Sequence, residues 1–118
     1  MNRKELGQRA EDLAGEYLKK AGLEIVERNY YIRGGELDII ALEGETVVFV
    51  EVRSKSSDCY GLPEETVSEK KQGFLYRAAE QYLIKNEWLE KNCRFDVVSV
   101  LFKDGKAEIK WYKDAFAQ

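Results

Sequence analysis

The sequence predicts an α+β fold in which a small mixed five-stranded sheet is flanked by helices, in the order α-β-β-β-α-β-β. Two segments carry apolar residues at helical spacing, and five runs are rich in β-branched and aromatic residues. Turn signals containing glycine separate the runs of strands. Because 118 residues suit one hydrophobic core, we expect residues 1–118 to form a single domain.

The first three strands follow a single helix. We expect that helix over roughly residues 3 to 21, because apolar residues recur there at helical spacing and Gly22 follows as a stop signal. A strand in EIVERNYYIR then ends at Gly34 and Gly35. The runs LDIIAL and TVVFVEV flank the turn sequence EGE and are predicted to form a hairpin.

A polar segment, SKSSDCYGLPEET, is predicted to be a loop that leads to a second helix and a second hairpin. Its length and polarity are typical of functional loops. Thr66 and Glu69 have capping-box spacing, and the apolar residues after them predict a helix of about five turns. RFDVVSVLF and KAEIKWY surround KDGK, in which Asp104 and Gly105 predict a mirror-image two-residue turn.

The composition narrows the function classes. The chain has no histidine, which excludes Ser-His triads, histidine-ligated metal hydrolases and histidine general bases. Catalysis must then depend on carboxylates, lysines, arginines or tyrosines. The formal net charge of -3 argues mildly against a nucleic-acid partner, but a local basic patch is compatible with it. Without a long apolar run or a signal-peptide centre, we expect a cytoplasmic protein with no membrane partner.

Two acids in the predicted hairpin lie in strands that otherwise have a buried pattern. If the loop has two residues, Leu42 pairs with Val47 and Asp38 lies opposite Glu51. Opposed like charges are destabilising, and Mg²⁺ or Mn²⁺ held by both carboxylates offsets the repulsion. A three-residue loop instead places Asp38 opposite Val50 and turns it to the other face of the sheet.

The alternation of side chains along a strand puts Arg53 and Lys55 on the same side as Glu51. These cations are candidates for holding a nucleophilic water or for stabilising charge on a phosphate. The alternative is a purely structural pair, in which Asp38 and Glu51 are satisfied by the backbone or by Arg53.

Glu11 is a third candidate acid, from the first helix. It lies at the edge of the apolar stripe, with Gly7 four residues before it and Gly15 four residues after it. These glycines clear the helix surface directly above and below the carboxylate, and each costs roughly 1 kcal/mol in a helix interior. The space beside Glu11 therefore either belongs to a functional site or is required by close packing of the helix on the sheet.

Several motifs together resemble the YraN family of small bacterial proteins, which has a restriction-endonuclease-like fold. The resemblance covers nearly the whole chain, and GELDIIA followed at this interval by VFVEV is its most specific part. The matching residues are Gly7, Glu11, Ala14, Tyr17, Leu18, Gly22 and Asn29, then the runs at 35–41, 49–52 and 94–98. The chain is similar, more distantly, to archaeal Holliday junction resolvases, which share the fold and a D…ExK nuclease core.

The resemblance implies that Asp38 and Glu51 are metal ligands and that Glu11 is an accessory acid and further ligand. It also implies a lysine two residues after the glutamate, where this chain has Arg53. Arginine does not readily lose a proton, so Arg53 fits a phosphate-binding role better than a role as proton acceptor. Lys55 faces the same way, one step further along the strand.

Other residues have both a functional and an ordinary interpretation. Lys70 and Lys71, at the start of the second helix, are candidates for phosphate contacts or belong to a solvated helix face. Glu36 is either a further ligand or, as we expect, a solvated or turn-stabilising acid. Asp96 matches the family motif but begins a strand, where an acid is usually structural. The tyrosines at 30, 31 and 60 either stack on unpaired bases or are ordinary sheet and loop aromatics.

These observations predict a Mg²⁺- or Mn²⁺-dependent endonuclease-like protein that hydrolyses phosphodiester bonds in branched or structured DNA. The alternative is a catalytically inactive adaptor of the same fold that binds DNA or a protein partner. A homodimer is a further expectation, because related resolvases act as symmetric dimers and a two-fold substrate needs two active sites.

Overall fold

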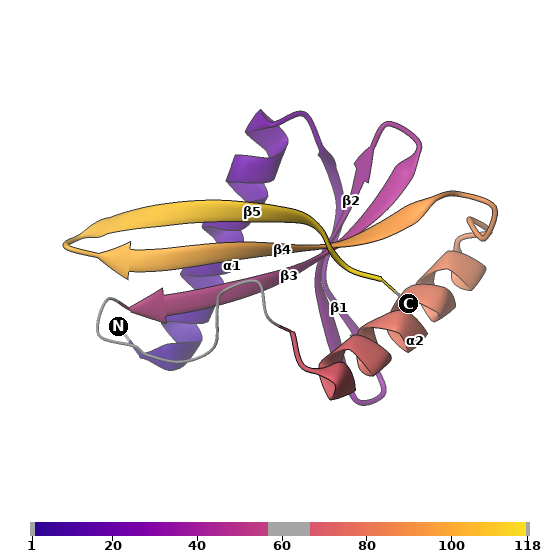
Figure 1. Ribbon diagram of the computed structural model, residues 1–118, viewed down its shortest axis with the longest axis horizontal. Helices are drawn as coiled ribbons and strands as arrows, with labels where there is room; N and C mark the ends of the chain where they lie inside the picture. The colour runs from indigo at the N-terminus through magenta and orange to yellow at the C-terminus, as the bar shows by residue number, and fades with distance from the viewer. Residues whose placement is uncertain (1, 57–66, 118) are drawn as a thin grey trace.

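The computed structural model describes residues 2–56 and 67–117. Two helices and five strands follow one another in the predicted order within these ranges (Figure 1). They are α1 (Arg3–Lys20), β1 (Glu24–Ile32), β2 (Gly35–Glu43), β3 (Thr46–Ser56), α2 (Glu69–Lys85), β4 (Cys93–Lys103) and β5 (Lys106–Phe116). The predicted α+β class and the element order are confirmed.

The five strands form one mixed sheet in the spatial order β1-β2-β3-β4-β5. Neighbouring strands are antiparallel except β3 and β4, which are parallel and are connected through α2. Antiparallel neighbours need only a tight turn, whereas a parallel pair needs a long crossover. The sheet is strongly twisted, so that β1 and β2 run across the direction of β3, β4 and β5 (Figure 1).

The helices cover opposite faces of the sheet, each over its own hydrophobic cluster. On one face, Ala10, Ala14 and Leu18 of α1 pack with Val48, Val50 and Val98. On the other face, Leu75, Ala78 and Ala79 of α2 pack with Ile40, Phe49 and Phe95. This alternation along β3 fits a strand that is buried on both sides. Glu51 follows these buried residues on β3 and therefore lies at the edge of the core, where the two packed layers end.

The ends of the helices follow the signals in the sequence, with one correction. Gly22 has a positive φ of 102° directly after α1, as a helix stop requires. Thr66 of the predicted capping box lies outside the described residues, and the N-cap of α2 is Ser68, whose Oγ accepts a hydrogen bond from the Lys71 N–H at 3.2 Å. Ser68 provides the same type of cap two residues later.

The strand β3 is longer than the sequence predicts, because it continues through Ser56 into the predicted polar loop. Its last residues pair with β4, for example Ser54 with Val100. The remainder of that loop, residues 57–66, lies outside the described residues. The second hairpin is as predicted, with Asp104 and Gly105 both at positive φ. Neither described helix has a stretch apolar and long enough to cross a membrane.

Candidate functional site

The β2–β3 hairpin has the two-residue loop that brings the two acids together. Leu42 pairs with Val47 and Ile39 pairs with Val50, so the predicted register is confirmed and the three-residue alternative is excluded. The ladder ends at Ile39 and Val50. The same register places Asp38 and Glu51 opposite each other at the next position, where the paired strands open.

A break in the side-chain alternation of β2 turns Asp38 towards α1 as well as towards β3. Residues two apart in a regular strand face the same side, but Leu37 packs in the cluster under α2 and Ile39 packs in the cluster under α1. On the neighbouring strand β1, Asn29 has a positive φ of 50°, and its Nδ2 donates to Glu11 Oε1 at 2.7 Å. The bend thus brings acids from α1, β2 and β3 to one place.

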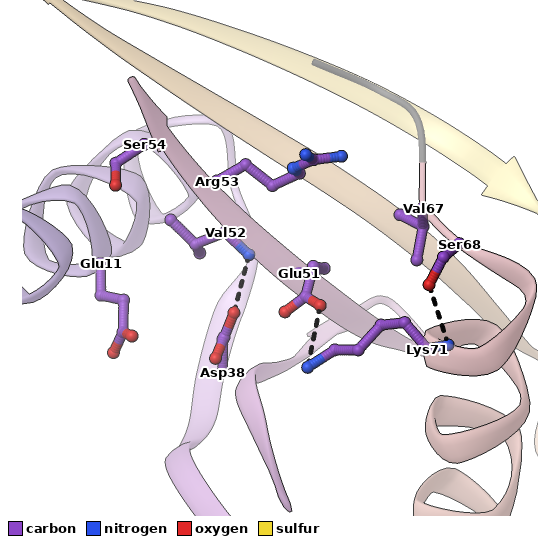
Figure 2. A pocket seen from close by; sticks show the side chains of 9 residues that line it. All are labelled: Glu11, Asp38, Glu51, Val52, Arg53, Ser54, Val67, Ser68 and Lys71. Carbon is purple, nitrogen blue, oxygen red and sulfur yellow. Dashed lines mark hydrogen bonds and ion pairs between the residues drawn. The ribbon is translucent and has the colours of Figure 1, made fainter. Parts of the chain in front are cut away.

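Three carboxylates lie close enough together to share one cation. Glu11, Glu36 and Asp38 each have a ligand oxygen within 4.8 Å of those of the other two. Asp38 also accepts a hydrogen bond from the backbone N–H of Val52 at 2.9 Å. Glu51 lies on the other side of Asp38 and contacts Lys71 of α2, with 3.3 Å between Oε2 and Nζ. Figure 2 shows Glu11, Asp38 and Glu51 directed into the same space.

The electrostatics of this cluster favour an additional positive charge. Burial, together with the adjacent Glu51 carboxylate, raises the pKa of Asp38 from 3.8 to about 8. The Val52 N–H and the charge of Lys71 lower this pKa but do not offset the increase. Burial also raises the pKa of Glu11, against the hydrogen bond from Asn29. Without a further cation, the folded chain holds a proton among these acids at neutral pH.

A cavity of about 510 Å³ opens over the acids. Of the candidate residues, Glu11, Asp38, Glu51, Arg53 and Lys71 line it together with Val52, Ser54, Val67 and Ser68. Lys55 and Lys70 are described residues that do not line it, so any contact of theirs with a phosphate would be made outside the cavity.

Arg53 does not fill the gap between the acids. Its guanidinium is directed away from the carboxylates in Figure 2, and it forms no ion pair with any residue in the described ranges. The cation in contact with Glu51 is Lys71. Of the structural alternative, the part in which Arg53 satisfies the acids therefore does not hold, whereas the part in which the backbone does so is met for Asp38 by the Val52 N–H.

The similarity of this chain to known proteins identifies its family. A family model described as "Uncharacterised protein family UPF0102" matches residues 10–100, which run from within α1 through α2 and most of β4. The chain belongs to this family. The resemblance to the YraN family is thereby confirmed.

Relatives within UPF0102 match along almost their entire length. A UPF0102 protein of Carboxydothermus hydrogenoformans is 45% identical over 114 residues, 97% of each chain. One of Syntrophomonas wolfei is 45% identical over 116 residues, 98% of this chain and 100% of the relative. One of Syntrophus aciditrophicus is 46% identical over 110 residues, 93% of this chain and 87% of the relative. The names of these relatives assign no activity.

Two further residues of the UPF0102 chain lie beside the acids, and one of them, Arg28, was missed at the level of sequence. Glu36, expected to be a solvated or turn-stabilising acid, lies beside the β1–β2 turn opposite Tyr31, and one of its carboxylate oxygens is within 4.8 Å of ligand oxygens of Glu11 and Asp38. Arg28 was not singled out, although its Nη2 lies 2.9 Å from Asp12 Oδ1 and 3.8 Å from Glu11 Oε1. Arg28 precedes Asn29, whose positive φ of 50° departs from the regular strand geometry that a strict two-residue period assumes.

Asp96 has a structural environment. It is fully buried and accepts hydrogen bonds from Arg94 Nε at 3.0 Å, from Trp111 Nε1 at 2.9 Å and from the Asp114 N–H at 2.9 Å. Arg94 in turn donates to Glu43 at 2.6 Å. Through these donors the Asp96 carboxylate links β4 to β5 and, through Arg94, to Glu43 at the end of β2. Asp96 does not line the cavity.

The tyrosines divide between the core and the surface. Tyr30 packs edge-on against Tyr82, with ring centroids 5.1 Å apart, and is an ordinary packing residue. Tyr31 is 76% exposed, and the Glu36 carboxylate raises its pKa. Tyr60 lies outside the described residues. The exposed ring beside the acids is therefore Tyr31.

The glycines of α1 are not required by close packing. A Cβ at Gly7 or Gly15 would meet no heavy atom within 4 Å. Of the two explanations for these glycines, close packing against the sheet is not supported, although Gly15 is buried, and the space beside Glu11 remains.

Proposed function

We propose that this UPF0102 protein is a metal-dependent endonuclease that hydrolyses phosphodiester bonds in branched or structured DNA. The observation that carries the proposal is the position of Asp38, which lies half-buried between Glu11 and Glu36 on one side and Glu51 on the other. Acids gathered from three elements around one half-buried carboxylate destabilise the fold unless a cation neutralises them. The restriction-endonuclease-like fold implied by the YraN resemblance is compatible with the observed element order.

The residues present fit a hard divalent cation. Carboxylate oxygens are the donors that Mg²⁺ and Mn²⁺ prefer, and the elevated pKa of Asp38 marks a deficit of positive charge at the site. Asp38 and Glu51 would hold the ion, with Glu11 as a further ligand through water or directly and Glu36 within reach. When bound, such an ion supplies Lewis-acid polarisation of a phosphoryl oxygen and an acidified water.

The other groups of the cavity suit a phosphate and an adjacent base. Arg53 lines the cavity and has a planar guanidinium that matches phosphate oxygens. Lys55 and Lys70 lie outside it, where they can contact neighbouring phosphates of a longer strand. The exposed Tyr31 ring provides a platform for an unpaired base beside the acids. This platform supports branched DNA over intact duplex, and a homodimer would present two such sites to a two-fold junction.

The rival function is a catalytically inactive adaptor that binds DNA or a protein partner. Two observations favour it: Arg53 occupies the position where the nuclease pattern has lysine, and Lys71 already neutralises Glu51 without a metal. The net charge of -3 also agrees with a protein partner. In this case the acids would have no catalytic role, and Lys71 would stabilise them in the fold.

Cleavage assays separate the two functions. Labelled junction, flap, single-stranded and duplex DNA are incubated with the purified chain in Mn²⁺ or in chelator, beside Asp38→Asn and a surface control, Glu108→Gln. The nuclease predicts Mn²⁺-dependent cutting of a branched substrate that Asp38→Asn abolishes and Glu108→Gln retains. Binding of any substrate without cutting, unchanged by chelator, assigns the adaptor function instead.

A further inference from the structure

Two cations from different elements, Arg53 and Lys71, line the acidic cavity, and of these two only Lys71 forms an ion pair with one of its acids. Lys71 extends from the first turn of α2 across the cavity, so that Nζ lies 3.3 Å from Glu51 Oε2 (Figure 2). Arg53, on the same strand as Glu51, points away from the carboxylates. The positive charge beside Glu51 thus comes from the helix that crosses over between β3 and β4, whereas Arg28 of β1 lies on the Glu11 side of the cluster.

The surroundings of Lys71 hold its ammonium group in place. Its backbone N–H donates to the N-cap Ser68, which fixes the first turn of α2 over the cavity. Its Nζ lies 5.5 Å from the centroid of the Phe74 ring, and that ring packs against Gly34 and Gly35 at the start of β2. A Cβ at Gly35 would lie 2.9 Å from the Phe74 ring, so the glycine permits this approach. The ammonium is therefore positioned by three elements.

The ammonium also has free capacity for a ligand. The side chain of Lys71 is 40% exposed, whereas that of its partner Glu51 is 11% exposed. A lysine ammonium has three donors, and among the described residues Glu51 is the only acid within ion-pair distance. One N–H directed at Glu51 leaves the others for oxygens of a ligand that enters the open side of the cavity.

We propose that Lys71 is a catalytic residue, the cation that donates to a non-bridging oxygen of the scissile phosphodiester and stabilises the charge that develops there. This inference rests on the proposed function. In the reaction the oxygen of a water forms a bond to phosphorus, the bond from phosphorus to the leaving oxygen breaks, and that oxygen takes a proton from solvent. The water releases one proton to solvent, and Lys71 stays protonated throughout. Glu51 keeps the ammonium in position before the substrate arrives.

The test compares Lys71→Ala and Lys71→Arg with Lys85→Ala, which removes the same charge at the far end of α2. Mn²⁺ affinity is measured by isothermal titration calorimetry, DNA affinity in chelator, and cleavage under single-turnover conditions. For Lys71→Ala we expect a fall of about 10²- to 10³-fold in the cleavage rate, with Mn²⁺ affinity unchanged or tighter because a competing cation is gone. Lys71→Arg should recover part of the rate, and Lys85→Ala should stay within about 3-fold of wild type.

Three results overturn the inference while leaving the proposed function intact. Lys71→Ala cuts as fast as wild type, or loses only DNA affinity at an unchanged saturating rate, or loses cleavage because Mn²⁺ binding or folding is lost. The first makes Lys71 dispensable, the second makes it a docking residue and the third makes it structural. If wild type neither binds Mn²⁺ nor cuts any substrate, the proposed function itself fails and the inference falls with it.

Discussion

Removing the charge of Asp38 should stabilise the metal-free protein at neutral and alkaline pH. Burial and the adjacent Glu51 raise the pKa of Asp38 from 3.8 to about 8, so the folded chain binds a proton there more tightly than the unfolded chain. The stability that this proton contributes is greatest at low pH and is lost as the pH rises from about 4 to about 8. Wild type should therefore become less stable through this window.

The size of the change in the free energy of unfolding follows from the pKa shift of Asp38. Each pKa unit corresponds to about 1.4 kcal/mol, which gives a penalty on the order of 4 kcal/mol at pH 7. Because Asp38 and Glu51 share the titration, we expect about 2–4 kcal/mol in practice. Asparagine keeps an oxygen that can accept from the Val52 N–H, so the variant loses the charge and not the hydrogen bond.

The assay is urea unfolding in chelator at intervals between pH 4 and pH 9. Asp38→Asn is compared with wild type and with Glu108→Gln, which removes an exposed acid with no ion pair to a described residue. The stability gain of Asp38→Asn should grow from near zero at pH 4 to its full value at pH 8, and Glu108→Gln should show no such trend. An Asp38→Asn protein that is less stable than wild type at pH 8, or a gain that does not change with pH, would refute the electrostatic reasoning.

Further predictions concern stability and DNA binding. Gly7→Ala should raise the free energy of unfolding by about 0.5–1 kcal/mol, because the helix interior has room for the methyl group; a decrease in urea unfolding would show that the space is not free. Arg94→Met should cost about 3 kcal/mol by removing a partner of the buried Asp96, and a loss below about 1 kcal/mol would contradict that role. Tyr31→Ala should weaken flap DNA binding by about 5- to 100-fold in fluorescence anisotropy at unchanged stability, whereas equal affinity would remove the stacking platform.

Local sequence patterns were sufficient for the scaffold of the site. The EGE turn with apolar runs on both sides fixed the register of β2 and β3, and that register alone brings Asp38 opposite Glu51. The helical spacing around Glu11 likewise placed it on the buried edge of α1. These features depend on neighbours in sequence or across one tight turn, which a pattern of period two or 3.6 describes.

The remaining parts of the site depend on contacts between distant elements. Lys71 reaches Glu51 only because α2 crosses over the sheet between two parallel strands. Glu36 joins the acids only because β1 bends at Asn29 and the alternation of β2 changes at Asp38. An asparagine inside a strand was the available signal for that bend, since asparagine adopts positive φ more readily than most residues.

Titration of Mn²⁺ into the metal-free protein, followed by calorimetry, tests the central claim most directly. Wild type should bind Mn²⁺ saturably through the acids around Asp38. Asp38→Asn should lose this binding, and Glu108→Gln should keep it. A comparison of Glu36→Gln with Glu51→Gln then identifies which neighbour of Asp38 completes the site. Wild-type protein that takes up no Mn²⁺ at millimolar concentration, or Asp38→Asn that binds it as well as wild type, would contradict the account.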